Sequence, residues 1–149
     1  MTQQSNPSAP GRRLTDRTAI DAVAKDASAV AVLGIRSEAH AQKPAHYVPA
    51  RLQRLGVRIV PVPVYEPEVS EMLGEPVVRD LREAGPVDIV CVFRRPEDVT
   101  GHLEDLLALH PPVVWLQSGI RNEEVADALT AAGIDVVQDE CLMVRRMAG

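Results

Sequence analysis

Short apolar runs alternate along this chain with segments whose apolar residues recur every three or four positions. The first run, residues 29–34 (AVAVLG), is apolar throughout, which is typical of a parallel strand buried on both faces of a sheet. The strands predicted from such runs cover residues 29–34, 57–62, 86–93, 112–116 and 134–137. The helices predicted around them cover residues 17–26, 48–55, 97–109 and 122–132. This order predicts an α/β fold, a doubly wound and mostly parallel sheet of about five to six strands with helices on both faces.

Local signals set the ends of the first two helices. Asp16 is a suitable N-cap for residues 17–26, and Gly56 suits the left-handed end of the helix over residues 48–55. The start of that second helix stays open, because Pro44 and Pro49 both favour a first turn and only one can occupy it. The segment before Pro49 is then either loop or helix.

Two stretches are less regular. We expect a helical turn over residues 68–73 that ends at Gly74, an extended piece over 76–78 and a short helix over 79–84, together at the edge of the sheet. Residues 1–13 are polar and rich in Ser, Pro and Gln, and they lack the apolar stretch of a secretory signal. We therefore expect a disordered N-terminal tail over residues 1–13 and a single domain over residues 14–149.

The composition narrows the possible partners. The net charge is −5 and aromatic residues make up 3%, which argues against a nucleic-acid partner. No apolar run approaches the roughly 20 residues that span a bilayer, so we expect no membrane partner. Cys91 and Cys141 lie far apart without a CxxC motif. We therefore expect a cytoplasmic protein with no disulfide and no metal.

The fold class selects the residues to inspect, because ligands of open α/β sheets bind beyond the carboxyl ends of the strands, where the strand order reverses. Gly34 ends the first predicted strand and lets the backbone turn sharply toward a ligand. Arg36, Lys43, Arg94 and Arg95 are expected around the same crevice. Four cations at one crevice suit a ligand that carries several phosphates.

Two parts of this crevice have alternative interpretations. An alternative interpretation is that Arg94 and Arg95 only pair with Glu97 and Asp98 at the start of a helix. Residues 117–119 (QSG) either donate amides and a carboxamide to a polar ligand or only shape a strand-to-helix turn. Both alternatives stay open at the level of sequence.

A dinucleotide site is poorly supported. The GxGxxG fingerprint is incomplete, because Arg36 and Ala39 stand where its second and third glycines belong. The strand over residues 57–62 ends in Val62 and Pro63 rather than in the acidic residue that holds a ribose hydroxyl.

Residues suited to catalysis are also few. The four histidines, at positions 40, 46, 102 and 110, show no metal-ligand spacing and are expected at solvent. Cys91 and Trp115 are expected in the core, and Cys141, at the end of a strand, has no placed base beside it. No catalytic residues are therefore assigned.

Several motifs together match a known family. They are Gly34 after an apolar strand, KP at 43–44, YV at 47–48, Gly56, PVP at 61–63, LGE at 73–75, VDIV at 87–90, VFRR at 92–95, VWLQSG at 114–119, and Asp139 with Cys141. Over about residues 15–145 the chain resembles the small single-domain CoA-binding proteins. These in turn look like the CoA-binding domain of the succinyl-CoA synthetase alpha subunit.

The resemblance implies a Rossmann-like domain that holds coenzyme A across the crevice. The residues then expected to face the phosphates are Gly34, Ile35, Arg36 and Ser37, with Lys43 and Pro44 nearby. Val62 and Pro63 are expected on the adenine side, and Phe93, Arg94 and Arg95 in the middle. Gln117, Gly119 and Ile120 are expected to approach the pantetheine arm.

Two departures from the family pattern affect these expectations. Val62 stands where the family often has Asn, which concerns the adenine contact, and Glu140 follows Asp139 where a basic residue is common. The synthetase also uses a phosphorylated histidine from a second domain, for which this sequence has no counterpart, so ligase activity is not expected.

The function expected from these observations is a non-catalytic module that binds coenzyme A or an acyl-CoA as a carrier or sensor. One alternative is an NAD(P)-binding oxidoreductase in which Arg36 and Arg94 hold a 2′-phosphate. Another is a subunit of a CoA-dependent enzyme complex that donates its crevice to a protein partner.

Overall fold

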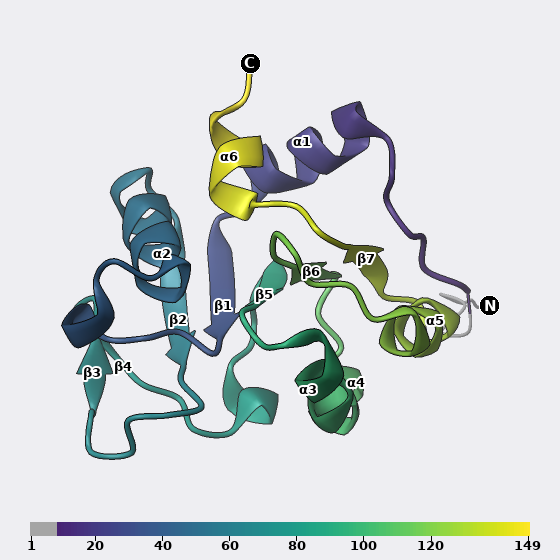
Figure 1. Ribbon diagram of the computed structural model, residues 1–149. Helices are drawn as coiled ribbons and strands as arrows, with labels where there is room; N and C mark the ends of the chain where they lie inside the picture. The colour runs from purple at the N-terminus through teal and green to yellow at the C-terminus, as the bar shows by residue number, and fades with distance from the viewer. Residues whose placement is uncertain (1–8) are drawn as a thin grey trace.

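A five-stranded parallel sheet runs through the part of the chain that the computed structural model describes, residues 9–149 (Figure 1). Its strands are β1 (Ala29–Leu33), β2 (Arg58–Val62), β5 (Ile89–Val92), β6 (Val113–Leu116) and β7 (Asp135–Val137). The α-helices are α1 (Arg17–Asp26), α2 (Pro44–Arg54), α3 (Pro96–Val99), α4 (Leu103–Leu109), α5 (Glu123–Ala131) and α6 (Leu142–Met147). Short 3-10 helices cover Glu38–His40, Leu81–Glu83 and Thr100–His102.

The strand order is β2-β1-β5-β6-β7. The chain builds outward from β1 to β2 and then returns to the other side of β1 to add β5, β6 and β7. The order therefore reverses between β1 and β5, which is the switch point where such sheets bind ligands. The predicted Rossmann-like, doubly wound α/β fold is confirmed.

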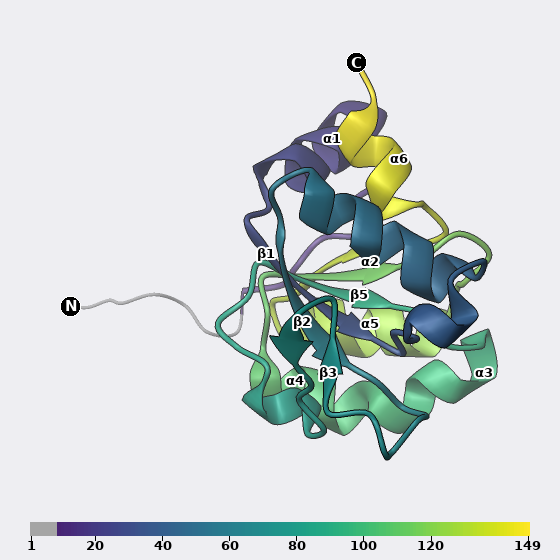
Figure 2. The same cartoon turned by 90° about the vertical axis from the view of Figure 1, so that its left-hand side faces the viewer.

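Helices cover both faces of the sheet. Figure 2 shows α1, α2 and α6 above the sheet and α3, α4 and α5 below it. Alternate residues of each strand face the two layers, because successive strand side chains point to opposite faces. In β1, Val30 and Val32 pack with α1, α2 and α6, whereas Ala31 and Leu33 pack on the opposite side. β5 and β6 are buried throughout in this aliphatic core, and β1, β2 and β7 are buried except for the first residue of each strand.

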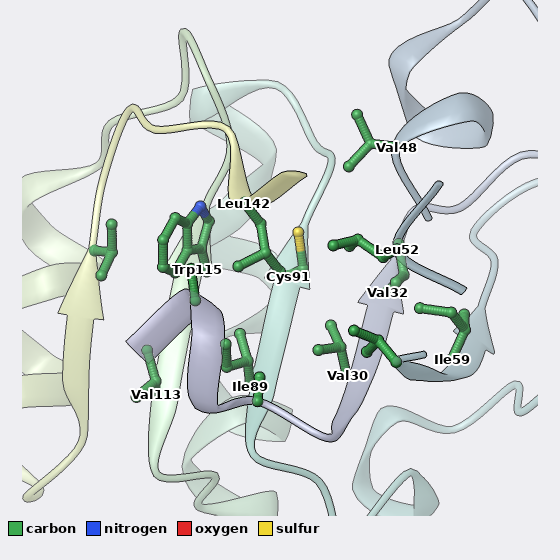
Figure 3. Packing of buried hydrophobic residues seen from close by; sticks show 14 of the residues in the cluster. Val30, Val32, Val48, Leu52, Ile59, Ile89, Cys91, Val113, Trp115 and Leu142 are labelled. Carbon is green, nitrogen blue, oxygen red and sulfur yellow. The ribbon is translucent and has the colours of Figure 1, made fainter. Parts of the chain in front are cut away.

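Figure 3 shows the first of these layers, in which side chains from all five strands of the sheet pack with those of α1, α2 and α6. Trp115 is fully buried there, as expected from the sequence, and its indole Nε1 donates a hydrogen bond to the Glu140 carbonyl oxygen at 2.7 Å. This bond satisfies the one polar atom of the largest core side chain and holds the chain after β7 against β6.

Helix α2 resolves the choice between the two prolines. Pro44 occupies the first turn, as proline favours, and Pro49 lies inside the helix. A proline has no N–H to give to the carbonyl four residues earlier, which leaves the Ala45 carbonyl oxygen free. The N–H of Arg36 donates to that oxygen at 3.1 Å, so the loop after β1 is anchored where the helix lacks its own bond. The segment before Pro49 is helix, not loop.

The stretch after β2 differs from its prediction. The helical turn expected over residues 68–73 is wrong: β3 (Glu71–Met72) and β4 (Glu75–Pro76) form an antiparallel hairpin. Leu73 and Gly74 at its tip both have positive φ, as the favoured two-residue hairpin turns require. The hairpin is a separate sheet beside β2, and Val78 N–H donates to the Pro61 carbonyl oxygen at 2.8 Å.

Two further differences concern helices. The single helix predicted over residues 97–109 is divided into α3 and α4 by the 3-10 turn Thr100–His102, which contains Gly101. Helix α6, which follows β7, was not predicted, since only six residues are helical there. It packs against α1.

The predicted disordered tail over residues 1–13 can be compared with the structure only from residue 9 on, because residues 1–8 lie outside the described residues. Its last part is wrong for Arg12 and Arg13, which run alongside β7. The Val136 N–H donates to the Arg12 carbonyl oxygen, and Arg13 forms a parallel bridge with Val136. Within residues 9–149, none of the helices combines the length and the apolar character needed to cross a bilayer.

Candidate functional site

A cavity of about 590 Å³ opens at the carboxyl ends of the parallel strands. Its wall is built from the ends of β1, β5 and β6, the first turn of α2, the loop after β2, and the start of α6. The predicted site residues that line it are Gly34, Arg36, Lys43, Pro44, Phe93, Arg94, Arg95, Gln117 and Ile120. The structure therefore gathers these side chains around one cavity beside the switch point, while their role in binding stays a prediction.

The other predicted residues lie outside the cavity lining. Ile35 is fully buried in the core. Ser37 turns away, and its Oγ donates to Glu66 Oε1 at 2.6 Å. Gly119 lies in a turn where its N–H donates to Asp139 Oδ1 at 2.6 Å.

The pair expected on the adenine side is also placed elsewhere. Val62 and Pro63 are buried at the end of β2, and the Val62 carbonyl oxygen accepts the N–H of Gly34 at 2.9 Å. Val62 thus contributes its backbone to the sheet rather than a side chain to the cavity.

Gly34 is required by the neighbouring strand rather than by a ligand. Its φ is 89°, and a Cβ atom would lie less than 3.0 Å from the Phe93 carbonyl oxygen. An L-residue with a side chain therefore meets both a disfavoured backbone conformation and a steric clash here. The close approach of β1 and β5 brings the loops that carry Arg36 and Arg94 together.

Charge is distributed unevenly around the cavity. Arg36, Lys43, Arg94 and Arg95 line it, and none of the described residues that line it is Asp or Glu. The whole chain has a net charge of −5. The cations therefore concentrate positive charge at the ligand end of an acidic protein.

Arg94 and Arg95 pair with carboxylates at the start of α3, as the alternative interpretation predicted. Arg95 Nε donates to Asp98 Oδ2 at 2.9 Å, and Arg94 Nη2 lies 3.8 Å from the same oxygen. The hydrogen bond from Arg95 is the main cause that lowers the pKa of Asp98. Arg95 remains 74% exposed, so this ion pair is well solvated and leaves its other donors available.

Arg36 is held from the side opposite the cavity. Its Nη2 donates to His40 Nε2 at 2.8 Å, and its Nε lies 3.7 Å from Glu66 Oε2. Desolvation raises the pKa of Glu66, but the hydrogen bonds from Ser37 and the charge of Arg36 outweigh it and bring that pKa below its ordinary value. The buried Nε has no hydrogen-bond partner among the described residues.

Tyr65, in the loop after β2, joins the two arginines. Its ring centroid lies 5.2 Å from Cζ of Arg36 and 5.6 Å from Cζ of Arg94, within cation–π range. Arg94 Nη1 donates to the tyrosine hydroxyl at 3.2 Å. Tyr65, three residues after β2, was not predicted, because its contacts with two arginines from other loops leave no pattern in the sequence.

Arg94 has a second partner in His102. Arg94 Nε donates to His102 Nε2 at 3.2 Å, which requires an unprotonated imidazole nitrogen. Burial, followed by the charge of Arg94, lowers the pKa of His102. The expectation that His102 lies at solvent is wrong, because it is half-buried beneath this arginine.

The other end of the cavity is apolar. Ile120, Cys141, Met143 and Val144 line it, of which the last two come from the helix that the sequence did not predict. Gln117, only 3% exposed, closes this end. Its Oε1 accepts the N–H of Leu142 at 2.8 Å and the thiol of Cys91 at 3.4 Å, so it fixes α6 to the end of β6.

The fold and the cavity define a doubly wound α/β protein whose cavity lies at the switch point and is basic at one end and apolar at the other. Residues 28–147 match the family described as "CoA binding domain". The chain belongs to this family.

Relatives in other organisms support the assignment. The chain is 38% identical over 116 residues to the uncharacterized protein YneT of Bacillus subtilis, covering 77% of this chain and 82% of that protein. A solved structure from Thermus thermophilus is 43% identical, with a TM-score of 0.78 over 88% of this chain and 96% of that one. A hypothetical protein from Pyrococcus horikoshii, 20% identical with a TM-score of 0.77 over 97% and 96% of the two chains, shares the fold.

Proposed function

We propose that the cavity binds coenzyme A or an acyl-CoA and that the protein acts as a non-catalytic carrier or sensor of it. The observation that carries the proposal is the wall of the cavity, where Arg36, Lys43, Arg94 and Arg95 stand without an acidic residue. Coenzyme A is the ligand that the family assignment suggests, and its phosphates are what such a group of cations recognises.

The two ends of the cavity fit the two halves of this ligand. The cations come from the ends of β1 and β5 and from the start of α2, and they suit the phosphates. The apolar end lies beside β6 and α6 and suits the pantetheine arm.

A non-catalytic role is supported by what surrounds the candidate nucleophiles. Ser118 and Cys141 line the cavity, but among residues 9–149 its lining contains no His, Asp or Glu to take a proton from either. A serine or cysteine needs such a base, or a lowered pKa, to act as a nucleophile in catalysis. We also propose a cytoplasmic location, which agrees with the two cysteines being free thiols.

Ligand-dependent thermal stability tests the proposal. The melting temperature is measured with coenzyme A, acetyl-CoA, 3′-dephospho-CoA, NAD and NADPH, all at the same concentration. A ligand present at about 100 times its Kd stabilises the folded protein by about 2.7 kcal/mol, which is a readily measured shift. We expect the two CoA forms to raise the melting temperature, the 3′-dephospho form to raise it less, and NAD and NADPH to have no effect. Stabilisation by NADPH alone, or by none of the five ligands, contradicts the proposal.

A matched pair of variants tests the location of the site. Arg95 and Arg121 are both exposed arginines paired with nearby carboxylates, but only Arg95 lines the cavity. Arg95→Ala is expected to weaken coenzyme A binding by about threefold, an effect that shrinks at high salt, whereas Arg121→Ala leaves it unchanged. If the two substitutions change the Kd for coenzyme A equally, the phosphates do not bind at the cations of this cavity.

A further inference from the structure

The apolar end of the cavity holds a thiol beside a buried carboxamide. Cys141 is half-buried and lines the cavity at the start of α6. Gln117 lines the same end, and its Oε1 accepts the N–H of Leu142, the residue next to Cys141. The two side chains are therefore held together by the attachment of α6 to β6.

Gln117 carries a donor that the protein does not use. Its Oε1 is occupied by Leu142 and Cys91, while its Nε2 makes no hydrogen bond within residues 9–149. Nε2 is not among the fully buried unpaired atoms of the described residues, so it is accessible from the cavity, where an acceptor atom can pair with it. The free Nε2 points to a ligand that brings an acceptor oxygen to this end, as the amide carbonyls of a pantetheine arm do.

The width of the sheet sets how far such an arm must reach. Adjacent strands lie about 4.8 Å apart, so the end of β6, two positions from β1, lies about 10 Å from the end of β1. The cations stand at β1 and β5, and the chain after β7 returns to β6. Glu140 N–H donates there to the Leu116 carbonyl oxygen and Leu142 N–H to Gln117 Oε1, so Cys141 lies beside the end of β6. An arm anchored by its phosphates at the cations and lying along the strand ends has to cover only this distance to bring its terminal sulfur to Cys141.

We propose that Cys141 is a modification site that forms a mixed disulfide with coenzyme A, an inference that rests on the proposed function of the cavity. The co-reactant is a disulfide of coenzyme A. The Cys141 thiolate attacks one sulfur of that disulfide, the sulfur–sulfur bond of the reagent breaks, and the second coenzyme A leaves as a thiolate. The proton that Cys141 gives to water is balanced by the one that the leaving thiolate takes up, and one disulfide replaces another without any further oxidant.

The position of Cys141 allows this reaction. The neighbouring Val144 lines the cavity and is 46% exposed, so the end that holds Cys141 is open to solvent. The second half of a coenzyme A disulfide has room to leave on that side. Reversal needs only a free thiol, so the bound state responds to the ratio of thiol to disulfide around the protein.

Cys91 provides an internal comparison. It is fully buried in β5 among the core side chains that Figure 3 shows, and its thiol donates to Gln117. Burial, followed by the proximity of Cys141, raises the pKa of its thiol well above the ordinary value. Cys91 therefore stays protonated and shielded, and we expect no modification there.

The test begins with reversible binding. The melting temperature of the reduced protein is measured with acetyl-CoA, which has no free thiol. The protein is then treated with coenzyme A disulfide, and intact mass and peptide mapping identify the modified cysteine. We expect one coenzyme A per chain, on Cys141, removed by dithiothreitol, absent in Cys141→Ser and retained in Cys91→Ala.

Two controls separate a directed reaction from general thiol reactivity. Glutathione disulfide has no phosphates to anchor it, so we expect it to react with Cys141 at least about tenfold more slowly. Acetyl-CoA occupies the cavity and is expected to slow the reaction with coenzyme A disulfide. Peptide mapping of the treated wild-type protein identifies the modified cysteine even if a cysteine variant does not fold.

The outcomes distinguish this inference from the proposed function. If acetyl-CoA does not stabilise the reduced protein, the proposed function fails and the inference fails with it. Three results would contradict the modification site while the binding function stands, provided that acetyl-CoA binds. They are the absence of an adduct, an adduct on Cys91, and an equally fast reaction with glutathione disulfide.

Discussion

Gly34 lies so close to Phe93 that a Cβ atom on residue 34 would come within 3.0 Å of the Phe93 carbonyl oxygen. This contact joins the ends of β1 and β5 at the switch point and sets the spacing of the loops that carry Arg36 and Arg94. The shape of the cavity therefore depends on a residue that offers it no side chain.

Gly34→Ala is expected to destabilise the protein by on the order of 3 kcal/mol or more, because the new methyl group adds a clash to a strained backbone. Gly56→Ala is the matched control. Gly56 has a similar φ of 95°, but a Cβ there meets no atom within 4 Å, so only the backbone strain of about 1 kcal/mol is expected. Urea unfolding of both variants measures the difference, and equal losses would show that the contact with Phe93 carries no energy.

Tyr65 is expected to hold Arg36 and Arg94 ready for a ligand. Tyr65→Ala removes both cation–π contacts, so we expect it to weaken coenzyme A binding by about tenfold. Tyr65→Phe keeps the ring and loses only the hydroxyl that Arg94 contacts, so a loss of about threefold is expected. Isothermal titration calorimetry measures both. An unchanged Kd in Tyr65→Ala contradicts a role for Tyr65 in positioning these arginines.

The fold was predictable because its strands are apolar runs that only a parallel sheet buries. The predicted strands contain β1, β2, β5, β6 and β7, and helix α1 has the predicted bounds, Arg17–Asp26. The hairpin formed by β3 and β4 was missed because two residues per strand are too few to show alternation. Its Leu73 and Gly74 were instead interpreted as the end of a helix.

The site was predictable to the extent that it follows strand ends. Arg36, Phe93, Arg94 and Gln117 each stand within three residues of a strand, and parallel strands bring such residues to one edge. Tyr65 stands as far after β2 as Arg36 does after β1, but its importance comes from contacts with arginines of two other loops, which no local pattern in the sequence reveals. Met143 and Val144 were missed because α6 is stabilised by contacts with α1 and Gln117 rather than by a local signal.

The environment of His102 predicts a stability loss in mild acid. Its pKa lies below the ordinary 6.5, so near this pH the unfolded chain binds the proton more readily than the folded protein. The stabilisation from neutral His102 is thus complete above 6.5 and is lost as the pH falls through the lowered folded pKa. Protonation also replaces the hydrogen bond from Arg94 with repulsion.

His102→Gln tests this dependence, because glutamine offers Arg94 an acceptor oxygen without titrating. Melting temperatures of both proteins are compared between about pH 7 and pH 5, the range in which histidine changes charge. The wild type is expected to lose more stability than the variant over this range. Parallel curves would assign the acid sensitivity to other groups.

Gln117 is expected to be the attachment point of α6. Gln117→Met fills the same space but leaves the buried N–H of Leu142 without its acceptor, at a cost of about 1–3 kcal/mol. Gln138→Met is the matched control, since Gln138 Oε1 likewise accepts a backbone N–H, that of Asn122, at a half-buried helix start where water can replace it. Hydrogen exchange is expected to accelerate over residues 142–147 in Gln117→Met alone. Equal protection of α6 in both variants would mean that packing against α1, and not the carboxamide, holds this side of the cavity in place.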